Sequence, residues 1–338
     1  MDFRTTFPIP SFHRKINISD KLLSMGSCFS TMIGSKLLER KFKVLNNPFG
    51  TIFNPVSLFE LLHRSLLLQP VEESLIVAHD QRYYHYTTHS DLSSGEKDQL
   101  LAMIQDKQLL TQESLLGASH IFLTFGSAYA YALVSDAQVV ANCHRQPKNQ
   151  FNKRLLDLDE MMDSFKGFYN ALKVLNPTAE IIVTVSPVRH IKEGIPENQL
   201  SKSLLRVFCH KMAEVCPCVS YFPSYELIMD DLRDYRYYKD DLIHPTAFAE
   251  NYIWELFKTT YLHAEALEVV RKIDAILNDL QHKPFHPGSV SHQQFLHMLV
   301  HKMEQMGPAF DFSKEINDVN DQLTLHHHNP TNHDQKSQ

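Results

Sequence analysis

Short, almost entirely apolar runs alternate along this chain with segments whose apolar residues recur every three or four positions. The clearest run is EIIVTVSPV at 180–188, and KLLSMG at 21–26 and HIFLTFG at 120–126 are similar. Runs of this kind are typical of parallel strands, because helices cover both faces of a parallel sheet and bury its side chains on each side. The alternation therefore predicts an α/β fold in which a mostly parallel sheet forms the middle of a three-layer αβα sandwich.

The other elements follow the same pattern. The apolar spacing and the prolines that open some segments predict the following additional strands and helices. The strands are expected at 42–47, 81–89, 137–144 and 218–223, and the helices at 28–40, 55–68, 151–175 and 245–261.

No strand-like run follows residue 262. Residues 1–262 are therefore expected to form the catalytic domain, and 263–312 a helical C-terminal extension with helices near 264–281 and 291–306. Residues 313–338 are polar and rich in histidine, and so few apolar side chains predict a disordered tail.

Charge and composition disfavour several classes of partner. The 338-residue chain has a formal net charge of −6, and no stretch concentrates Lys or Arg, so neither nucleic acid nor an anionic membrane is expected as a partner. The N-terminus lacks the apolar core of a signal peptide, and no apolar run is long enough to span a bilayer. Five cysteines without a secretion signal fit reduced thiols, so we expect a cytoplasmic location.

Two nucleophile-type residues stand side by side in MGSCFS, directly after the first strand. Ser27 and Cys28 follow Gly26, and a helical pattern begins at once. A side chain at such a strand-to-helix turn projects at the carboxyl edge of the sheet, where the helix N-terminus can stabilise an oxyanion. A serine that merely caps the helix is the alternative interpretation.

A candidate base lies near the end of the domain, in DDLIHPTAF. Asp241 and His244 are three residues apart, and Pro245 opens a helix. An aspartate at this spacing can hold one imidazole nitrogen, which leaves the other free to take a proton from a nucleophile. A capping aspartate beside a surface histidine is the alternative.

These segments, in this order, resemble the GSCFA family, within the SGNH (GDSL-like) hydrolase superfamily. The resemblance runs from about residue 20 to 260 and includes NNPFGTIFNPVS, LTFGSAYAY, VVANCHRQP and TVSPVRH. It implies the SGNH fold with a flavodoxin-like sheet. By position, it also implies Ser27 as nucleophile, His244 as general base and Asp241 as the residue that orients it. We then expect Cys28 to be the next residue into the helix, with its thiol packed inward as a small apolar group.

The resemblance also implies an oxyanion hole. Ser27 and Gly50 match two of the superfamily's donors, whereas Ala128 stands where an asparagine usually supplies the third. Asn142, at the end of a strand-like run, is our candidate replacement, with Asn54 as a second choice.

Three further residues follow strand-like runs and are possible substrate contacts. They are His144, Arg189 and His190. Polar residues at the carboxyl edge of an α/β sheet often line its binding site.

Together these features favour a serine hydrolase that acts on a small-molecule or carbohydrate ester, such as an O-acetyl ester, through a Ser-His-Asp triad. An O-acyltransferase with the same triad and a non-catalytic binding module that kept the fold are the alternatives. No nucleotide-binding P-loop or zinc-binding H-E-x-x-H motif occurs, so neither cofactor nor metal is expected.

Overall fold

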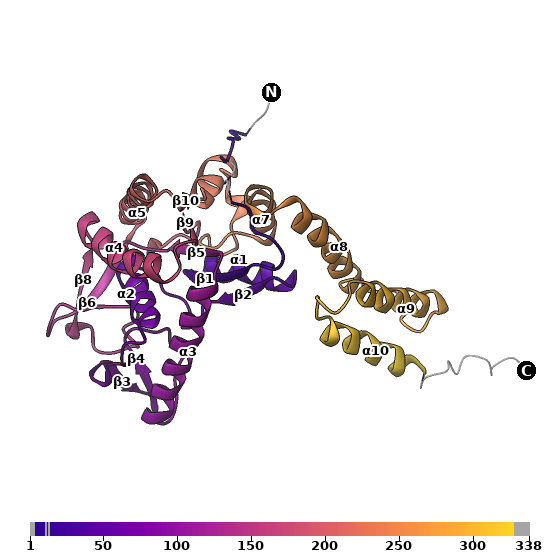
Figure 1. Cartoon of the computed structure of the whole chain (residues 1–338), viewed down its shortest axis with the longest axis horizontal. Coiled ribbons are helices and arrows are strands. Elements are labelled where there is room, and N and C mark those ends of the chain that lie inside the picture. Colours follow the sequence, from indigo (N-terminus) through magenta and orange to yellow (C-terminus); the bar gives the residue numbers. More distant parts are fainter. Residues whose placement is uncertain (1–3, 11, 13, 328–338) are drawn as a thin grey trace, which may run out of the picture. The chain divides into compact units, whose positions relative to one another are not determined.

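The computed structural model describes residues 4–10, 12 and 14–327. Two compact units make up the chain, Met1–His263 and Ala264–Gln338. Figure 1 shows the first as strands surrounded by helices and the second as consecutive helices.

A five-stranded parallel sheet forms the centre of the first unit, in the order β10-β9-β5-β1-β2. Its strands are β1 (Lys21–Gly26), β2 (Lys43–Asn46), β5 (His120–Phe125), β9 (Glu180–Val185) and β10 (Val219–Tyr221). This is the flavodoxin-like order, so the predicted α/β fold is confirmed. Because all five strands run the same way, their carboxyl ends share one edge.

Helices cover both faces of this sheet (Figure 1). One face packs against α2 (Pro55–Leu66), α3 (Lys97–Gly117), α4 (Leu158–Leu175) and α5 (Ile195–Val215), and the other against α1 (Cys28–Glu39) and α7 (Ala247–Tyr261). Side chains of β5 alternate between the two layers: Leu123 joins the core with α2 to α5, whereas Phe122 contacts Phe29 of α1 and Phe257 of α7.

The first unit also contains two smaller sheets and several short helical turns. A hairpin joins β3 (Ile76–His79) to β4 (Arg82–His85), and a three-stranded antiparallel sheet has the order β7-β6-β8. Its strands are β6 (Tyr129–Leu133), β7 (Val139–Val140) and β8 (Phe151–Leu155). After β10 come α6 (Ser224–Glu226) and a π-helical turn at Leu227–Asp231, and 3-10 turns lie at Glu73–Leu75, Lys148–Gln150, Ile191–Glu193 and Tyr235–Tyr237.

The predicted helix over 151–175 is wrong at its start. Residues 151–155 form β8, which pairs antiparallel with β6, and α4 begins only after Asp157, whose side chain accepts the N–H of Glu160. The strand forms because β6 offers it a partner that lies about twenty residues earlier in sequence. The expected strand at 137–144 is likewise reduced to β7.

Three helices pack together in the described part of the second unit, residues 264–327. They are α8 (Ala264–Leu280), α9 (Val290–Gln305) and α10 (Ser313–His327), so the predicted C-terminal helices are confirmed. The expected disordered tail from 313 differs from the structure, in which α10 occupies its first part. Phe312, Val319 and Leu323 are buried against α8 and α9, which gives this polar sequence an apolar face. The rest of that predicted tail, 328–338, lies outside the described residues.

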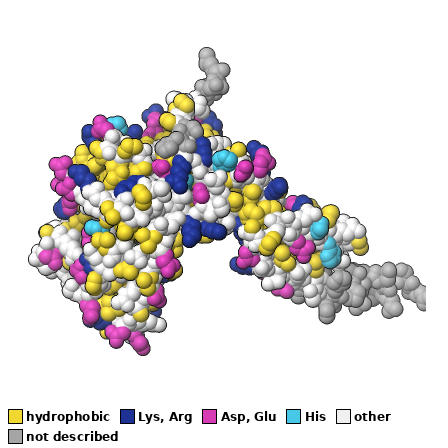
Figure 2. Space-filling view, viewed as in Figure 1, with side chains coloured by type: hydrophobic (Ala, Val, Ile, Leu, Met, Phe, Trp, Pro, Cys, Tyr) yellow, Lys and Arg dark blue, Asp and Glu magenta, His cyan; other side chains and the backbone are white. Residues whose placement is uncertain are grey.

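Positive and negative charges are mixed on the surface, as the similar numbers of basic and acidic residues lead us to expect. Figure 2 shows basic and acidic side chains together on one face of the molecule, with apolar side chains between them. No helix within the described residues is both long enough and apolar enough to cross a membrane.

We expect Gly26→Ala to destabilise the first unit strongly. Gly26 has φ +131°, and a Cβ there would lie 2.1 Å from the carbonyl oxygen of Thr124. Backbone strain and this clash together should lower the free energy of unfolding by at least about 2–3 kcal/mol. Urea unfolding followed by circular dichroism measures the change. The matched control is Gly95→Ala, where nothing lies within 4 Å of the added atom; equal losses in both variants would contradict this explanation.

Candidate active site

The turn from β1 into α1 is fixed by three hydrogen bonds. The N–H of Gly26 donates to Oδ1 of Asn47 at 2.8 Å, and the carbonyl of Gly26 accepts the N–H of Ile52 at 2.9 Å. The N–H of Ser27 donates to the carbonyl of Thr124 on β5 at 3.0 Å. The turn therefore lies against the neighbouring strand β5, and these bonds hold the backbone of Gly26 and Ser27 in place.

Ser27 points into the protein. Its side chain is fully buried, and within the described residues its Oγ has no hydrogen-bond partner. Its N–H is already bonded to Thr124, so neither group predicted to act in catalysis is available to a substrate. The structure thus differs from the expectation for Ser27, because the tight turn at Gly26 directs the first side chain of the turn inward.

Cys28, the first residue of α1, faces a cavity of about 510 Å3. Among the described residues, Cys28 lines this cavity and Ser27 does not. Its wall also includes Tyr129, Lys153, His190 and His244. The cavity lies at the carboxyl edge of the sheet, where α/β proteins commonly bind ligands.

Burial raises the pKa of the Cys28 thiol, because a thiolate is poorly solvated there. The positive charge of Lys202 and the N–H groups of Cys28 and Phe29 act in the opposite direction. The thiol is therefore protonated at neutral pH, and it needs a base to become a nucleophile.

Asp241 holds His244 on the loop before α7. Nδ1 of His244 lies 2.7 Å from Oδ2 of Asp241, whose Oδ1 accepts the N–H groups of Ile243 and His244 at 2.9 and 3.0 Å. These bonds, that of the His244 N–H foremost, hold the pKa of the Asp241 carboxyl well below its usual range. An ionised carboxylate accepts a hydrogen bond from Nδ1–H. In that tautomer of the neutral ring, Nε2 carries no proton and can accept one.

His190 lines the same cavity as a neutral ring. Burial, followed by the charges of Lys202, His244 and Lys153, lowers the pKa of His190 to about 3. Its edge contacts Phe53, and within the described residues its Nε2 has no hydrogen-bond partner. His190 is thus positioned to form a hydrogen bond in the cavity but does not take up a proton near neutral pH.

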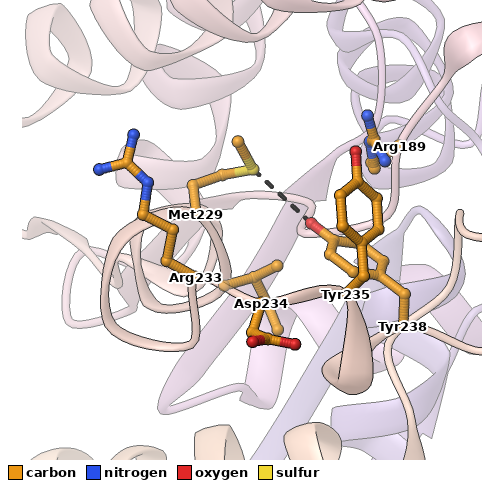
Figure 3. A pocket seen from close by; sticks show the side chains of 7 residues that line it. Arg189, Met229, Arg233, Asp234, Tyr235 and Tyr238 are labelled. Atoms are coloured by element: carbon orange, nitrogen blue, oxygen red, sulfur yellow. Dashed lines mark hydrogen bonds between the residues drawn. The ribbon is translucent and has the colours of Figure 1, made fainter. Parts of the chain in front are cut away.

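Arg189 connects the His244 loop to a second pocket of about 160 Å3. Its N–H donates to the carbonyl of Ile243, and its Nη1 donates to that of Leu242 at 3.2 Å. Figure 3 shows its guanidinium beside Tyr235 and Tyr238, at 5.9 and 5.5 Å from their ring centres. Arg189 therefore braces the loop that carries His244, besides lining both pockets.

Of the other predicted contacts, Asn54 lines the cavity, but its side chain bonds to Ser57 and to the carbonyl of Val140, whereas Gly50, Asn142 and His144 lie outside the cavity wall. The N–H of Gly50 donates to the carbonyl of Asn47, and Asn142 bonds to Ser90 and to the N–H of His144. Both ring nitrogens of His144 are also engaged, by Ser90 and the carbonyl of His85. The structure therefore differs from the oxyanion expectation for Gly50 and Asn142 and the substrate expectation for His144, because these groups hold loops together.

Lys202 is a feature that the sequence did not suggest. This lysine of α5 is fully buried and donates to the carbonyls of Gly126 and Ser186, at 2.7 and 2.8 Å, just beyond β5 and β9. Burial lowers the pKa of Lys202 to about 7, although Cys28 acts in the opposite direction. No local pattern distinguishes this lysine from a solvated one, since its burial depends on where the strands end.

Comparison with known proteins identifies the family. A profile described as the GSCFA family matches residues 21–257, well over half of the chain. The chain belongs to the GSCFA family. A second profile, the C-terminal domain of GSCFA domain proteins, matches residues 273–325, within the helical second unit.

Other comparisons of this GSCFA protein are weaker. A crystal structure of a carbohydrate esterase family 3 protein from Talaromyces cellulolyticus shares 11% identity with a TM-score of 0.26. The alignment covers 47% of the GSCFA chain and 65% of the other, so it spans less than two thirds of that protein. No curated protein matches the chain. In the part of the chain that the structure describes, no group of three or more His, Cys, Asp or Glu could hold a metal ion.

We expect Lys202→Met to change how stability depends on pH. The pKa of Lys202 falls from 10.5 to about 7 on folding, so between these pH values the unfolded chain binds more protons than the folded one. The stability contribution of Lys202 is therefore complete above pH 10.5 and is lost as pH falls toward 7. Relative to Lys202→Met, the wild type should gain on the order of a few kcal/mol over this interval.

Urea-unfolding free energies of both proteins at several pH values across this interval measure the difference. Cysteines and tyrosines titrate in both proteins, so their contributions cancel in the comparison. Two parallel stability profiles would show that Lys202 carries its charge in the folded state at no cost and would contradict the assignment.

Proposed function

We propose that this protein cleaves small acyl esters, with an O-acyl carbohydrate or similar polar metabolite as substrate. The observation that carries the proposal is the pair His244 and Asp241. A histidine whose Nδ1 is fixed by an ionised carboxylate opens onto the same cavity as the N-terminus of α1, which bears a nucleophile-type side chain. A base, a nucleophile and a helix N-terminus at one site are the parts that acyl transfer requires.

In this proposal His244 acts first as base and then as acid. Its Nε2 takes the proton of the nucleophile as that side chain attacks the ester carbonyl, and Asp241 stabilises the imidazolium that forms. The imidazolium then gives this proton to the departing alcohol, which leaves an acyl-enzyme. Water then attacks the acyl-enzyme while Nε2 of His244 takes one of its protons. That proton returns to the nucleophile as the acid is released.

The developing oxyanion has a donor set at the start of α1. The first N–H groups of a helix lack partners within the helix, and its dipole places partial positive charge there. The N–H groups of Cys28 and Phe29 stand at this position, and their effect on the Cys28 thiol indicates that they favour a nearby negative charge. They take the role that the sequence assigned to Ser27, Gly50 and Asn142.

The cavity wall suits a small polar ester. Tyr129 and Tyr131 offer aromatic faces of the kind that pack against sugar rings, and Lys153 lies 5.4 Å from both ring centres. Lys153 also pairs with Glu193, so charge and hydrogen-bonding groups border the apolar surface. A volume of about 510 Å3 holds a monosaccharide-sized ester.

We expect His244→Gln to abolish most hydrolysis of p-nitrophenyl acetate, because glutamine cannot accept and return the proton. The loss in kcat should be about 10²- to 10⁴-fold. Asp241→Asn should also lower kcat, since an amide does not fix the Nδ1–H tautomer or stabilise the imidazolium. Release of p-nitrophenol measures both.

The matched control is His210→Gln, on the exposed surface of α5. It should keep wild-type activity, and thermal unfolding should show that all three variants fold. Full activity in folded His244→Gln, or no hydrolysis by the wild type, would overturn the proposed function.

A further inference from the structure

Ser27 and Cys28 are adjacent nucleophile types that the fold treats differently. Ser27 is fully buried, its N–H is bonded to Thr124, and its hydroxyl is absent from the described cavity wall. Cys28 is partly exposed and lines the cavity that His244 also lines. In this conformation, therefore, a substrate in the cavity meets Cys28 and not Ser27.

We propose that the thiol of Cys28, rather than the hydroxyl of Ser27, is the nucleophile of this site. The inference rests on the proposed function for its base, His244, and extends it by naming the attacking atom and the intermediate. The intermediate is then a thioester, and the protein is a cysteine-dependent acyl hydrolase.

The surroundings of Cys28 support this role. Lys202 is fully buried and close enough to the Cys28 thiol to interact with it electrostatically. Its position is fixed by the carbonyls of Gly126 and Ser186, so any positive charge it carries stays in place. A thiolate at a helix N-terminus beside a cation is a recurrent arrangement in reactive cysteines.

The reaction balances without a redox partner. The S–H proton of Cys28 moves to Nε2 of His244 as sulfur bonds to the ester carbonyl carbon. The C–O bond then breaks, and the alcohol leaves with that proton. Water next attacks the thioester while Nε2 takes one of its protons; the C–S bond breaks, and the proton returns to sulfur. The sum is ester plus water giving acid plus alcohol.

The test locates the acyl group on the whole chain. We expect brief exposure to p-nitrophenyl acetate, followed by acid quench and mass spectrometry, to show one acetyl group on Cys28 that neutral hydroxylamine removes, as it does a thioester. Cys28→Ala should lose the adduct and at least about a hundred-fold in kcat. Ser27→Ala should keep both, because its buried hydroxyl has no partner to lose.

Iodoacetamide supplies a readout that does not depend on turnover. It should alkylate Cys28 faster than Cys143, whose pKa burial raises to about 11, and this advantage should disappear in His244→Gln. Cys143→Ala, outside the cavity wall, is the control variant and should keep full hydrolysis.

The outcomes separate the two proposals. Hydrolysis that persists in Cys28→Ala and disappears in Ser27→Ala, with a hydroxylamine-resistant adduct on Ser27, would overturn the assignment of Cys28 and leave the esterase function standing. Absence of both hydrolysis and adduct in the wild type would overturn the esterase function. Alkylation of Cys28 that is no faster than that of Cys143, and is unaffected by His244→Gln, would overturn the pairing of Cys28 with His244.

Discussion

The close contact between the end of β1 and β5 determines much of this site. Gly26 can lie against the Thr124 carbonyl because it has no Cβ, and Ser27 then bonds to that carbonyl through its N–H. At this contact the chain turns directly from β1 into α1. It buries Ser27, begins α1, and presents Cys28 at the first helical position. In our proposal, therefore, the backbone geometry decides which of the two side chains can act as the nucleophile.

The proposed base, His244, reaches the same cavity from the other end of the domain. Parallel strands bring their carboxyl ends to one edge, and Lys202 binds carbonyls just beyond two of them, β5 and β9. Arg189, which follows β9, holds the loop of Ile243 through the backbone, and Asp241 fixes the ring of His244 within that loop. The site is thus a set of loop residues braced against a rigid sheet, and its histidine is both partly exposed and held in one orientation.

The sequence predicted the fold more completely than it predicted the candidate site. Buried runs such as 120–126 and 180–188 identified strands well, since a strand buried on both faces is apolar throughout. The sequence did not predict the helix α3, because its apolar residues are not confined to one face. Leu109, Leu110 and Leu116, for example, are exposed. The strand β8 was taken for helix because its partner, β6, is distant in sequence.

The residues of the candidate site differ in the same way in how far the sequence predicts them. The spacing of Asp241 and His244 is local, and the two side chains do meet in the structure, with Nδ1 of His244 2.7 Å from Oδ2 of Asp241. The choice between Ser27 and Cys28 depends on a bond to another strand, and the burial of Lys202 depends on two more, so no local pattern reveals either.

The most direct measurement is a crystal structure of the protein after reaction with iodoacetamide. Our account predicts continuous density from Sγ of Cys28 into the cavity, with the acetamide group within hydrogen-bonding reach of Nε2 of His244 and with Ser27 still bonded to Thr124. An unmodified Cys28 whose thiol points away from His244, or a Ser27 hydroxyl that opens into the cavity, would contradict it.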